Sequence, residues 1–313
     1  MMKQRTQLTI GTRGSALALW QSTWVKSELA HHYPEVKVVV EIIRTTGDKI
    51  LDSPLSQIGD KGLFTKEIES ALLERRIDLA VHSLKDLPTS LPAGLTIGAI
   101  TKREDVRDVF ISHPEKSYSS LNAIPAGARI ATGSLRRRCQ LLRLRPDLKI
   151  VDIRGNLNTR FSKLDSSNWD GMILARAGVV RLGMENRITD VIPAETILPA
   201  VGQGALAIEI REDDKDLCRM LQPLASWATT LCTSAERAFL RFLEGGCQVP
   251  IGTYGRLEDS VFKLDAMIGS TDGKKFVRGA THSEPDRATD AAVELARTLY
   301  ETGGKDILQE IRK

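Results

Sequence analysis

The sequence predicts an α/β protein built from three domains, two of them α/β and the third a small α+β domain. Three observations support this prediction. Apolar, β-branched segments alternate with amphipathic segments through the first two thirds of the chain. After Trp227 this alternation gives way to one long helix, several strands and a final helix. With 313 residues, the chain is also longer than one hydrophobic core usually organises.

The first α/β domain is expected over residues 1–101 together with 202–222. Its strands are short and apolar, and we predict them at residues 8–11, 36–43, 79–82, 95–100 and 206–210. Ser15 is a suitable N-cap for an amphipathic helix, and a second helix is predicted over residues 66–75. A long irregular segment is expected between residues 44 and 64. The charged run at residues 102–105 indicates a crossover to the next domain.

The second α/β domain is expected over residues 105–198 and repeats the same alternation. We predict strands at residues 129–132, 149–153 and 171–175, with helices that begin at Leu135 and Asn158. Residues 199–204, which contain one proline and two glycines, are typical of a hinge through which the chain returns to the first domain.

The third domain, residues 227–313, contains an unusual cysteine. A helix is predicted over residues 227–243, and Gly245 and Gly246 end it because only glycine enters the left-handed region without steric cost. Pro250 fixes the chain beyond the turn. Cys247 is therefore expected at the tip of a rigid loop, although this pattern alone also permits a structural cysteine. A last helix is predicted over residues 288–301.

Polar clusters fall where the predicted strands end. They are Thr12-Arg13-Gly14-Ser15, Ser83-Leu84-Lys85-Asp86, residues 132–137 and residues 154–160. Alternating strands and helices predict parallel sheets, whose ligands lie beyond the carboxyl ends of the strands. Helix N-termini at two of these clusters favour anions. Two such domains, joined by two crossings, are expected to form a cleft like that of periplasmic anion-binding proteins.

Arginine is concentrated between residues 129 and 187, often beside Gly, Ser, Thr or Asn. The guanidinium fork matches carboxylate or phosphate, so this concentration suggests a polyanionic ligand. A solvated helix face is the alternative for Arg138, Arg143 and Arg145. Nucleic acid is a further alternative, opposed by the aromatic content of 5% and by the lack of a recognisable nucleic-acid motif.

The composition excludes several classes of protein. No apolar run approaches the roughly 18–20 residues that span a bilayer, and no apolar signal segment follows Met1, so we expect a cytoplasmic protein and no membrane partner. The four cysteines are scattered, without paired spacing or histidines at metal spacing. The sequence therefore predicts neither disulfides nor a bound metal.

Several ordered motifs together resemble the porphobilinogen deaminase (hydroxymethylbilane synthase) family. They are Gly11-Thr12-Arg13-Gly14-Ser15, residues 59–67, Val81-His82-Ser83-Leu84-Lys85-Asp86-Leu87-Pro88, Ser134-Leu135-Arg136-Arg137, Arg154-Gly155-Asn156-Leu157-Asn158-Thr159-Arg160, residues 200–204 and the Cys247 loop. The resemblance runs from about residue 10 to residue 252 and continues more weakly to the C-terminus. Because the motifs are independent and keep their order, the resemblance is specific.

The resemblance implies a monomeric transferase of three domains in tetrapyrrole biosynthesis. Such an enzyme joins four porphobilinogen molecules head to tail, releases ammonia at each addition, and hydrolyses the product to hydroxymethylbilane. Cys247 would carry a dipyrromethane cofactor through a thioether, and this cofactor primes the growing chain. The product bears an acetate and a propionate on every ring, which suits an arginine-rich cleft.

The resemblance also assigns roles to single residues. Asp86 would be catalytic, stabilising positive charge on the pyrrole as ammonia leaves. Cofactor contacts would come from Ser83, Lys85, Thr132, Ser134, Arg136 and Arg137. Substrate contacts would come from Arg13, Ser15, Lys61, Phe64, Arg154, Arg160, Arg181 and Gln203, with Lys61 and Phe64 on a mobile cover formed by residues 44–64. Two alternatives stay open for His82: a functional role, or a structural histidine at the end of a strand whose hydrogen bonds are made within the protein.

Three positions depart from the common pattern of the family. Gly133 stands where serine is usual, Gln57 where lysine is frequent, and Arg176 where the residue is usually small or apolar. The role of Arg176 is left open by the sequence. The rival function, a small-anion binding protein with the same cleft, would need neither Cys247 nor a third domain.

Overall fold

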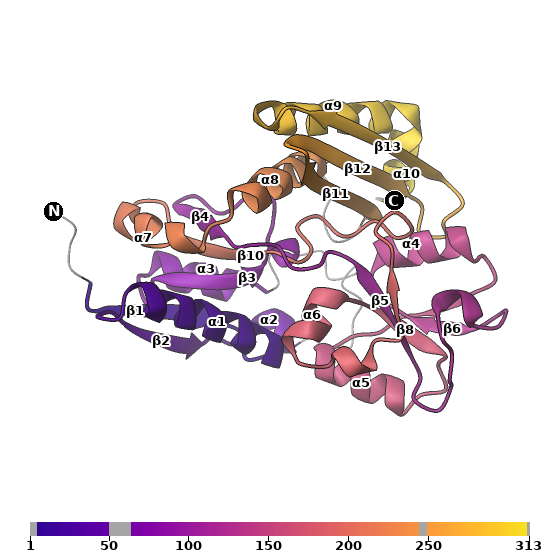
Figure 1. Ribbon diagram of the computed structural model, residues 1–313, viewed down its shortest axis with the longest axis horizontal. Coiled ribbons are helices and arrows are strands. Elements are labelled where there is room, and N and C mark those ends of the chain that lie inside the picture. The colour runs from indigo at the N-terminus through magenta and orange to yellow at the C-terminus, as the bar shows by residue number, and fades with distance from the viewer. Residues whose placement is uncertain (1–4, 50–63, 244–248, 312–313) are drawn as a thin grey trace. The chain divides into compact units, whose positions relative to one another are not determined.

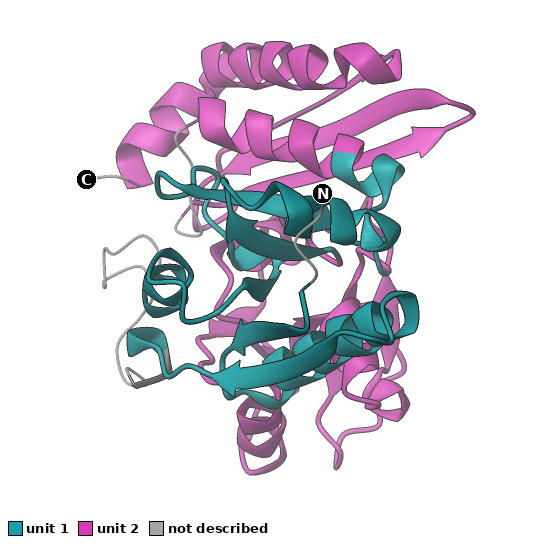
Figure 2. Cartoon of the chain, turned by 90° about the vertical axis from the view of Figure 1, so that its left-hand side faces the viewer, with its two compact units in different colours: residues 1–104, 205–230 teal, residues 105–204, 231–313 magenta. Residues whose placement is uncertain are grey.

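The structure is a computed structural model that describes residues 5–49, 64–243 and 249–311. The chain forms two compact units, Met1–Glu104 with Ala205–Thr230, and Asp105–Gly204 with Leu231–Lys313 (Figure 2). The limits of the three domains stay a prediction. The second unit contains all of the predicted second domain and most of the third.

A five-stranded sheet forms the centre of unit 1, in the order β2-β1-β3-β10-β4 (Figure 1). Its strands are β1 (Gln7–Thr12), β2 (Lys37–Ile42), β3 (Leu79–Ser83), β4 (Leu95–Ile100) and β10 (Leu206–Arg211). Its helices are α1 (Ala16–His32), α2 (Thr46–Lys49), α3 (Lys66–Leu73) and α7 (Lys215–Met220). Ser15 caps α1 as expected, since its Oγ accepts a hydrogen bond from the Ala18 N–H.

Alternation along the strands supplies two cores, one on each face of this sheet. Leu79 and Val81 of β3 pack in one cluster with Leu29 of α1, whereas Ala80 packs in another with Leu72 of α3. The sheet is thus covered on both faces, which explains why its strands are apolar throughout instead of alternating with polar residues.

The prediction of parallel sheets holds only in part, because both five-stranded sheets are mixed. β1 runs parallel to β2 and β3, but β10 is antiparallel to both β3 and β4. A parallel neighbour requires a crossover connection, and β10 is instead the strand with which the chain re-enters unit 1 after residue 204. As a consequence, the end of β4 and the start of β10 lie at the edge where β1 and β3 also end.

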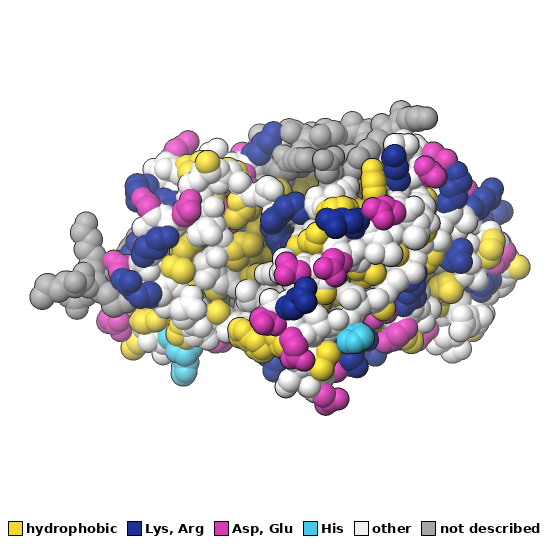
Figure 3. All heavy atoms as spheres, turned by 90° about the horizontal axis from the view of Figure 1, so that it is seen from above, with side chains coloured by type: hydrophobic (Ala, Val, Ile, Leu, Met, Phe, Trp, Pro, Cys, Tyr) yellow, Lys and Arg dark blue, Asp and Glu magenta, His cyan; other side chains and the backbone are white. Residues whose placement is uncertain are grey.

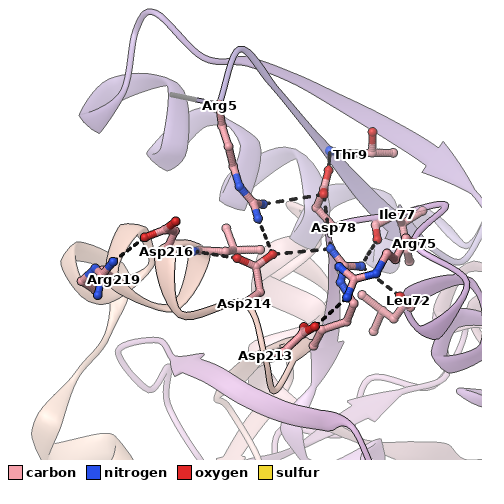
Figure 4. A network of polar contacts seen from close by, with 12 residues as sticks. Arg5, Thr9, Leu72, Arg75, Ile77, Asp78, Asp213, Asp214, Asp216 and Arg219 are labelled. Atoms are coloured by element: carbon pink, nitrogen blue, oxygen red, sulfur yellow. Dashed lines mark hydrogen bonds and ion pairs between the residues drawn. The ribbon is translucent and has the colours of Figure 1, made fainter. Parts of the chain in front are cut away.

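A network of ion pairs connects residues at the opposite edge of this sheet (Figure 4). The buried Arg211 donates to the carbonyl oxygens of Leu72 at 2.9 Å and Ile77 at 2.6 Å. Its guanidinium also lies 3.5 Å from the carboxylates of Asp78 and Asp214, and Arg5 contacts the same two carboxylates. Two arginines therefore face two aspartates, and the network is balanced in charge.

Unit 2 contains a second five-stranded sheet, in the order β7-β6-β8-β5-β9. Its strands are β5 (Asp108–Ser112), β6 (Arg129–Ala131), β7 (Lys149–Val151), β8 (Gly171–Ala175) and β9 (Asp190–Ile192). Its helices are α4 (Leu135–Leu144), α5 (Leu157–Asp165) and α6 (Arg176–Arg181). β6 is parallel to β7 and β8, whereas β5 is antiparallel to β8 and β9. Phe110 and Ile130 belong to the core on one face, Val109 and Ala131 to that on the other.

The C-terminal part of unit 2 is an antiparallel three-stranded sheet with its own core. It comprises β11 (Ile251–Glu258), β12 (Val261–Gly269), β13 (Phe276–Ser283), most of helix α8 (Trp227–Phe242, which starts in unit 1), and the helices α9 (Ala288–Leu299) and α10 (Lys305–Ile311). The predicted last helix corresponds to α9, and beyond Glu301 the chain turns at Gly303, which has a φ of 128°, into α10.

Helix α4 packs closely against this third sheet within unit 2. A Cβ atom at Gly269 would lie 2.3 Å from the Cys139 Sγ, and one at Gly273 would lie 2.6 Å from the Cys139 carbonyl oxygen. Only glycine permits this approach. Burial raises the pKa of the Cys139 thiol to about 12, so this cysteine is an inert part of the packing.

The described residues also include two free thiols and several short elements. Cys139 is buried, and Cys218 is half-buried. β5, β9, α2, α6, α7 and α10 are short elements that were not predicted, and α2 lies in the segment 44–64 that was expected to be irregular. No helix within residues 5–49, 64–243 and 249–311 is long and apolar enough to cross a membrane.

Candidate active site

Two of the predicted polar clusters lie at the same edge of the unit 1 sheet. β1 and β3 are parallel neighbours, so the residues that follow Thr12 and those that follow Ser83 emerge side by side. The Ser83 hydroxyl accepts a hydrogen bond of 2.9 Å from Gln21 Nε2 of α1. The fold thus brings Arg13 and Ser15 to the edge that carries Lys85 and Asp86.

Asp86 ends a single 3-10 turn, Leu84–Asp86, which begins with one buried leucine and is followed by another. Leu84 and Leu87 are 1% and 4% exposed, and the Leu84 N–H donates to the Ala205 carbonyl oxygen at 3.0 Å. Asp86 itself is exposed, and Lys85 is half-buried. The two leucines anchor the turn, which presents the carboxylate of Asp86 to solvent from a fixed backbone.

Arg13 and Phe64 come together although they are distant in the sequence. The guanidinium carbon of Arg13 lies 4.1 Å from the centre of the Phe64 ring, a cation–π contact that orients the guanidinium. Lys61 and Gln57, which the sequence placed on the same cover segment, lie outside the described residues.

His82 points into the interior of unit 1. Its Nε2 lies 2.9 Å from Glu209 Oε2, and both side chains are buried beside Glu69. Burial, the largest influence, raises the pKa of Glu69 above its ordinary value. Of the two alternatives for His82, the structure favours the satisfied interior histidine.

In unit 2, another edge gathers the second set of clusters. The parallel strands β6, β7 and β8 end there, and the antiparallel β5 begins there. Ser134 caps α4 by accepting a hydrogen bond from the Arg137 N–H, and the Thr132 hydroxyl accepts one from the Ser134 N–H at 3.3 Å. Both hydroxyls that were predicted to touch the cofactor therefore also shape the start of α4.

Gly133, the first departure from the family pattern, has a local explanation. A Cβ atom at this position would lie 2.6 Å from the Ile153 carbonyl oxygen and 3.2 Å from a carboxylate oxygen of Asp152. The backbone approaches so closely that a serine side chain would have to push the chain after β7 away.

A buried carboxylate that the sequence did not reveal lies at this edge, at the start of β5. Asp108 is fully buried, and its two oxygens lie 2.8 Å from Nη2 of Arg136 and of Arg137. Gln203 Nε2 donates to the same carboxylate at 2.8 Å and to the Val106 carbonyl oxygen at 2.7 Å. Burial alone would raise the pKa of Asp108, but the two arginines outweigh it and hold that pKa well below its ordinary value.

The Asp108 cluster, which we define as Asp108, Arg136, Arg137 and Gln203, keeps one surplus positive charge. Arg136 also donates to the Leu198 carbonyl oxygen and Arg137 to that of Ile173, yet carbonyl groups carry no net charge. The Nε atoms of both arginines are buried without a hydrogen-bond partner among the described residues. A buried cluster with a net charge of this kind suits an anion beside it.

Arg154, Arg160 and Arg181 lie at this edge or beside it. Arg160 Nε donates to the Gly155 carbonyl oxygen at 2.9 Å, and Arg181 Nη2 to that of Gly204 at 2.7 Å. Arg154 is half-buried, its Nε lies 4.0 Å from the carboxylate of Asp152, and burial lowers the pKa of its guanidinium. The ligand roles of all these arginines stay predictions.

Two other kinds of site, a metal site and a nucleic-acid-binding surface, can be compared with the described residues. These residues include no group of three His, Cys, Asp or Glu side chains that could hold a metal ion. On the face drawn in Figure 3, basic and acidic side chains are interspersed, so the coloured residues of that face form no continuous basic stripe.

Comparison with known proteins identifies the family. A family model described as porphobilinogen deaminase, dipyromethane cofactor binding domain, matches residues 8–219, and one described as porphobilinogen deaminase, C-terminal domain, matches residues 230–301. The chain belongs to the porphobilinogen deaminase family. The resemblance seen in the sequence motifs is thus confirmed, and with it the enzyme class, transferase, and the dipyrromethane cofactor.

Named relatives agree with this assignment. Porphobilinogen deaminases of Chlorobaculum tepidum and Chlorobium phaeobacteroides are each 52% identical to this chain and cover 99% of both sequences. Among solved structures, the periplasmic VFT2 domain of Bordetella pertussis BvgS is similar at 12% identity and a TM-score of 0.42, over 69% of this chain and 86% of that one. The probable extracellular-binding protein YtmK of Bacillus subtilis is similar at 11% identity and a TM-score of 0.43, over 70% and 92%.

Proposed function

We propose that this porphobilinogen deaminase acts as a hydroxymethylbilane synthase in tetrapyrrole biosynthesis. It condenses four porphobilinogen molecules head to tail, releases ammonia at each addition, and hydrolyses the product to hydroxymethylbilane. The observation that carries the proposal is the 52% identity with named porphobilinogen deaminases across 99% of the chain. The small-anion binding function is not favoured, because those relatives span the whole length of this protein.

Asp86 is assigned the catalytic role within this function. Loss of ammonia from porphobilinogen leaves positive charge on the pyrrole, and a fixed carboxylate stabilises that charge better than mobile water does. The buried anchors Leu84 and Leu87 support the assignment, since they fix the backbone that carries Asp86. Ser83 and Lys85, on the same turn, are assigned to the cofactor.

The arginines are assigned to the acetate and propionate groups. Arg136 and Arg137 would hold the cofactor with Thr132 and Ser134. Substrate contacts are assigned to Arg13, Ser15, Lys61, Phe64, Arg154, Arg160, Arg181 and Gln203. The surplus charge of the Asp108 cluster supports this assignment, because a ligand that bears two carboxylates on every ring can balance it.

The residues present fit the dipyrromethane cofactor. When bound, this group supplies the pyrrole to which the first substrate is joined. Cys247, assigned to hold it by a thioether, lies outside the described residues, so the fit rests on the hydrogen-bond donors and surplus charge at the unit 2 edge. A thioether suits a permanent anchor because it withstands repeated condensation steps.

Purified protein incubated with porphobilinogen tests the function. We expect release of ammonia together with formation of hydroxymethylbilane. Binding of small anions without ammonia release would refute the proposal. The monomeric state and the cytoplasmic location stay predictions, and light scattering of the purified protein tests the first of them.

A further inference from the structure

Arg176 occupies the same edge of unit 2 as the arginines already assigned. It is the first residue after β8, and β8 runs parallel to β6, whose end leads into residues 132–137. Its side chain is 29% exposed, so a solute can reach it. The sequence left its role open.

The charge of Arg176 is poorly compensated in the protein. Its nearest carboxylate is Asp105, with Nη1 3.5 Å from Oδ2. That carboxylate is already bound by Arg107. The Arg107 Nε lies 3.0 Å from each carboxylate oxygen, and its Nη2 lies 2.6 Å from Oδ2. The Arg107 backbone N–H also donates to Oδ1 at 2.9 Å. One aspartate thus faces two arginines, and Arg176 is the more weakly bound of them.

The geometry of Arg176 also leaves hydrogen-bonding capacity unused. Its Nε is buried without a hydrogen-bond partner among the described residues. A side chain that served only to support Asp105 would be expected to make a shorter, two-pronged contact, as Arg107 does. Arg176 therefore combines an accessible guanidinium, a surplus charge and a place among the assigned anion contacts.

We propose that Arg176 is a further substrate contact, which binds one carboxylate of the growing pyrrole chain. The proposal rests on the function proposed above, since that function supplies a ligand with carboxylates on every ring. A guanidinium fork matches a carboxylate in shape and charge, and one partly exposed contact of this kind contributes about a five- to thirtyfold change in binding.

Arg176→Gln tests the proposal, with Arg187→Gln as the matched control. Arg187 has a 27% exposed side chain and pairs with Asp165 at 2.6 Å. It precedes β9, which runs parallel to β8, so it lies at the opposite edge of the sheet. Ammonia release would be followed at several porphobilinogen concentrations, in low and high NaCl, after circular dichroism has shown that each variant is folded.

We expect Arg176→Gln to raise the KM for porphobilinogen about five- to thirtyfold at low salt, with a much smaller change in kcat. The KM should also depend less on NaCl, because one ionic contact is lost. Arg176→Lys, which keeps the charge, should recover part of the loss. Arg187→Gln should leave both constants unchanged.

A second variant separates ligand binding from a supporting role. Asp105→Asn removes the carboxylate that Arg176 shares, so it should leave the KM at or below the wild-type value. If Arg176 only supports Asp105, both variants will raise the KM alike, and the inference is wrong. It is also wrong if Arg176→Gln leaves the KM and its salt dependence unchanged while the wild type is active. A wild-type protein that releases no ammonia would instead overturn the proposed function itself.

Discussion

Replacing Asp108 by asparagine removes the carboxylate that lies between Arg136 and Arg137. Asparagine keeps the size of the side chain and one oxygen acceptor, but its amide N–H groups would face a guanidinium. Breaking a buried ion pair by removing one partner costs about 3–5 kcal/mol of unfolding free energy. Since Asp108 is fully buried, we place the variant in this range. For domains of this size the loss corresponds to a drop of about 6–20 °C in the thermal midpoint.

The effect of Asp108→Asn should depend on pH in a defined direction. The arginines hold the pKa of Asp108 below its unfolded value, so the folded protein releases this proton more readily than the unfolded chain does. The stabilisation is therefore fully present above the unfolded pKa of about 4 and is lost as the pH falls through the folded pKa. The difference in unfolding free energy between wild type and variant should be constant from pH 7 to about pH 5 and shrink below about pH 4.

Urea unfolding at a series of pH values, followed by tryptophan fluorescence, measures this difference. Asp147→Asn is the control, because Asp147 pairs with Arg145 at 2.7 Å in the same unit but is exposed to solvent. Exposed pairs contribute little, so its unfolding midpoint should barely move. A difference for Asp108→Asn that is below about 1 kcal/mol at pH 7, or that stays constant down to pH 3, would refute the reasoning.

Three further predictions concern the reaction. Asp86→Asn should lower turnover by roughly a hundredfold or more while binding of the first substrate changes much less; turnover above half the wild-type value in the ammonia assay would exclude the assignment. Arg137→Leu should block loading or extension of the pyrrole chain, whereas Arg138→Leu, whose side chain is exposed, should be nearly silent; equal losses of activity would contradict this. Intact-mass measurement should show two linked pyrrole units on the wild type, which persist on denaturation and map to Cys247 by peptide mapping. The Cys247→Ser variant should lack these units. An unmodified yet fully active enzyme would overturn the cofactor assignment.

The parts of the fold that the sequence predicted are those governed by local rules. β1, α1, β6 and α4 are placed within a few residues of the prediction, because apolar strands and capped amphipathic helices leave a local pattern. β5 was not predicted. It begins just after the chain crosses between the units, and it pairs antiparallel with β8, which lies far along the sequence. Asp108 was also missed, because its partners on α4 lie 28 and 29 residues away in the sequence, and contacts between distant residues leave no local pattern.

The sequence also could not say how the arginines are used, and the structure separates them by their partners. At the edge opposite the candidate site of unit 1, Arg5 and Arg211 form ion pairs with two aspartates, Asp78 and Asp214, so the positive and negative charges balance. In unit 2, Arg136 and Arg137 share one aspartate, Asp108, and also donate to the carbonyl oxygens of Leu198 and Ile173. A carbonyl oxygen fixes the position of a guanidinium without neutralising it. These contacts hold both side chains in place while Asp108 neutralises only one of them, so the cost of ordering them is met before the proposed carboxylate ligand binds.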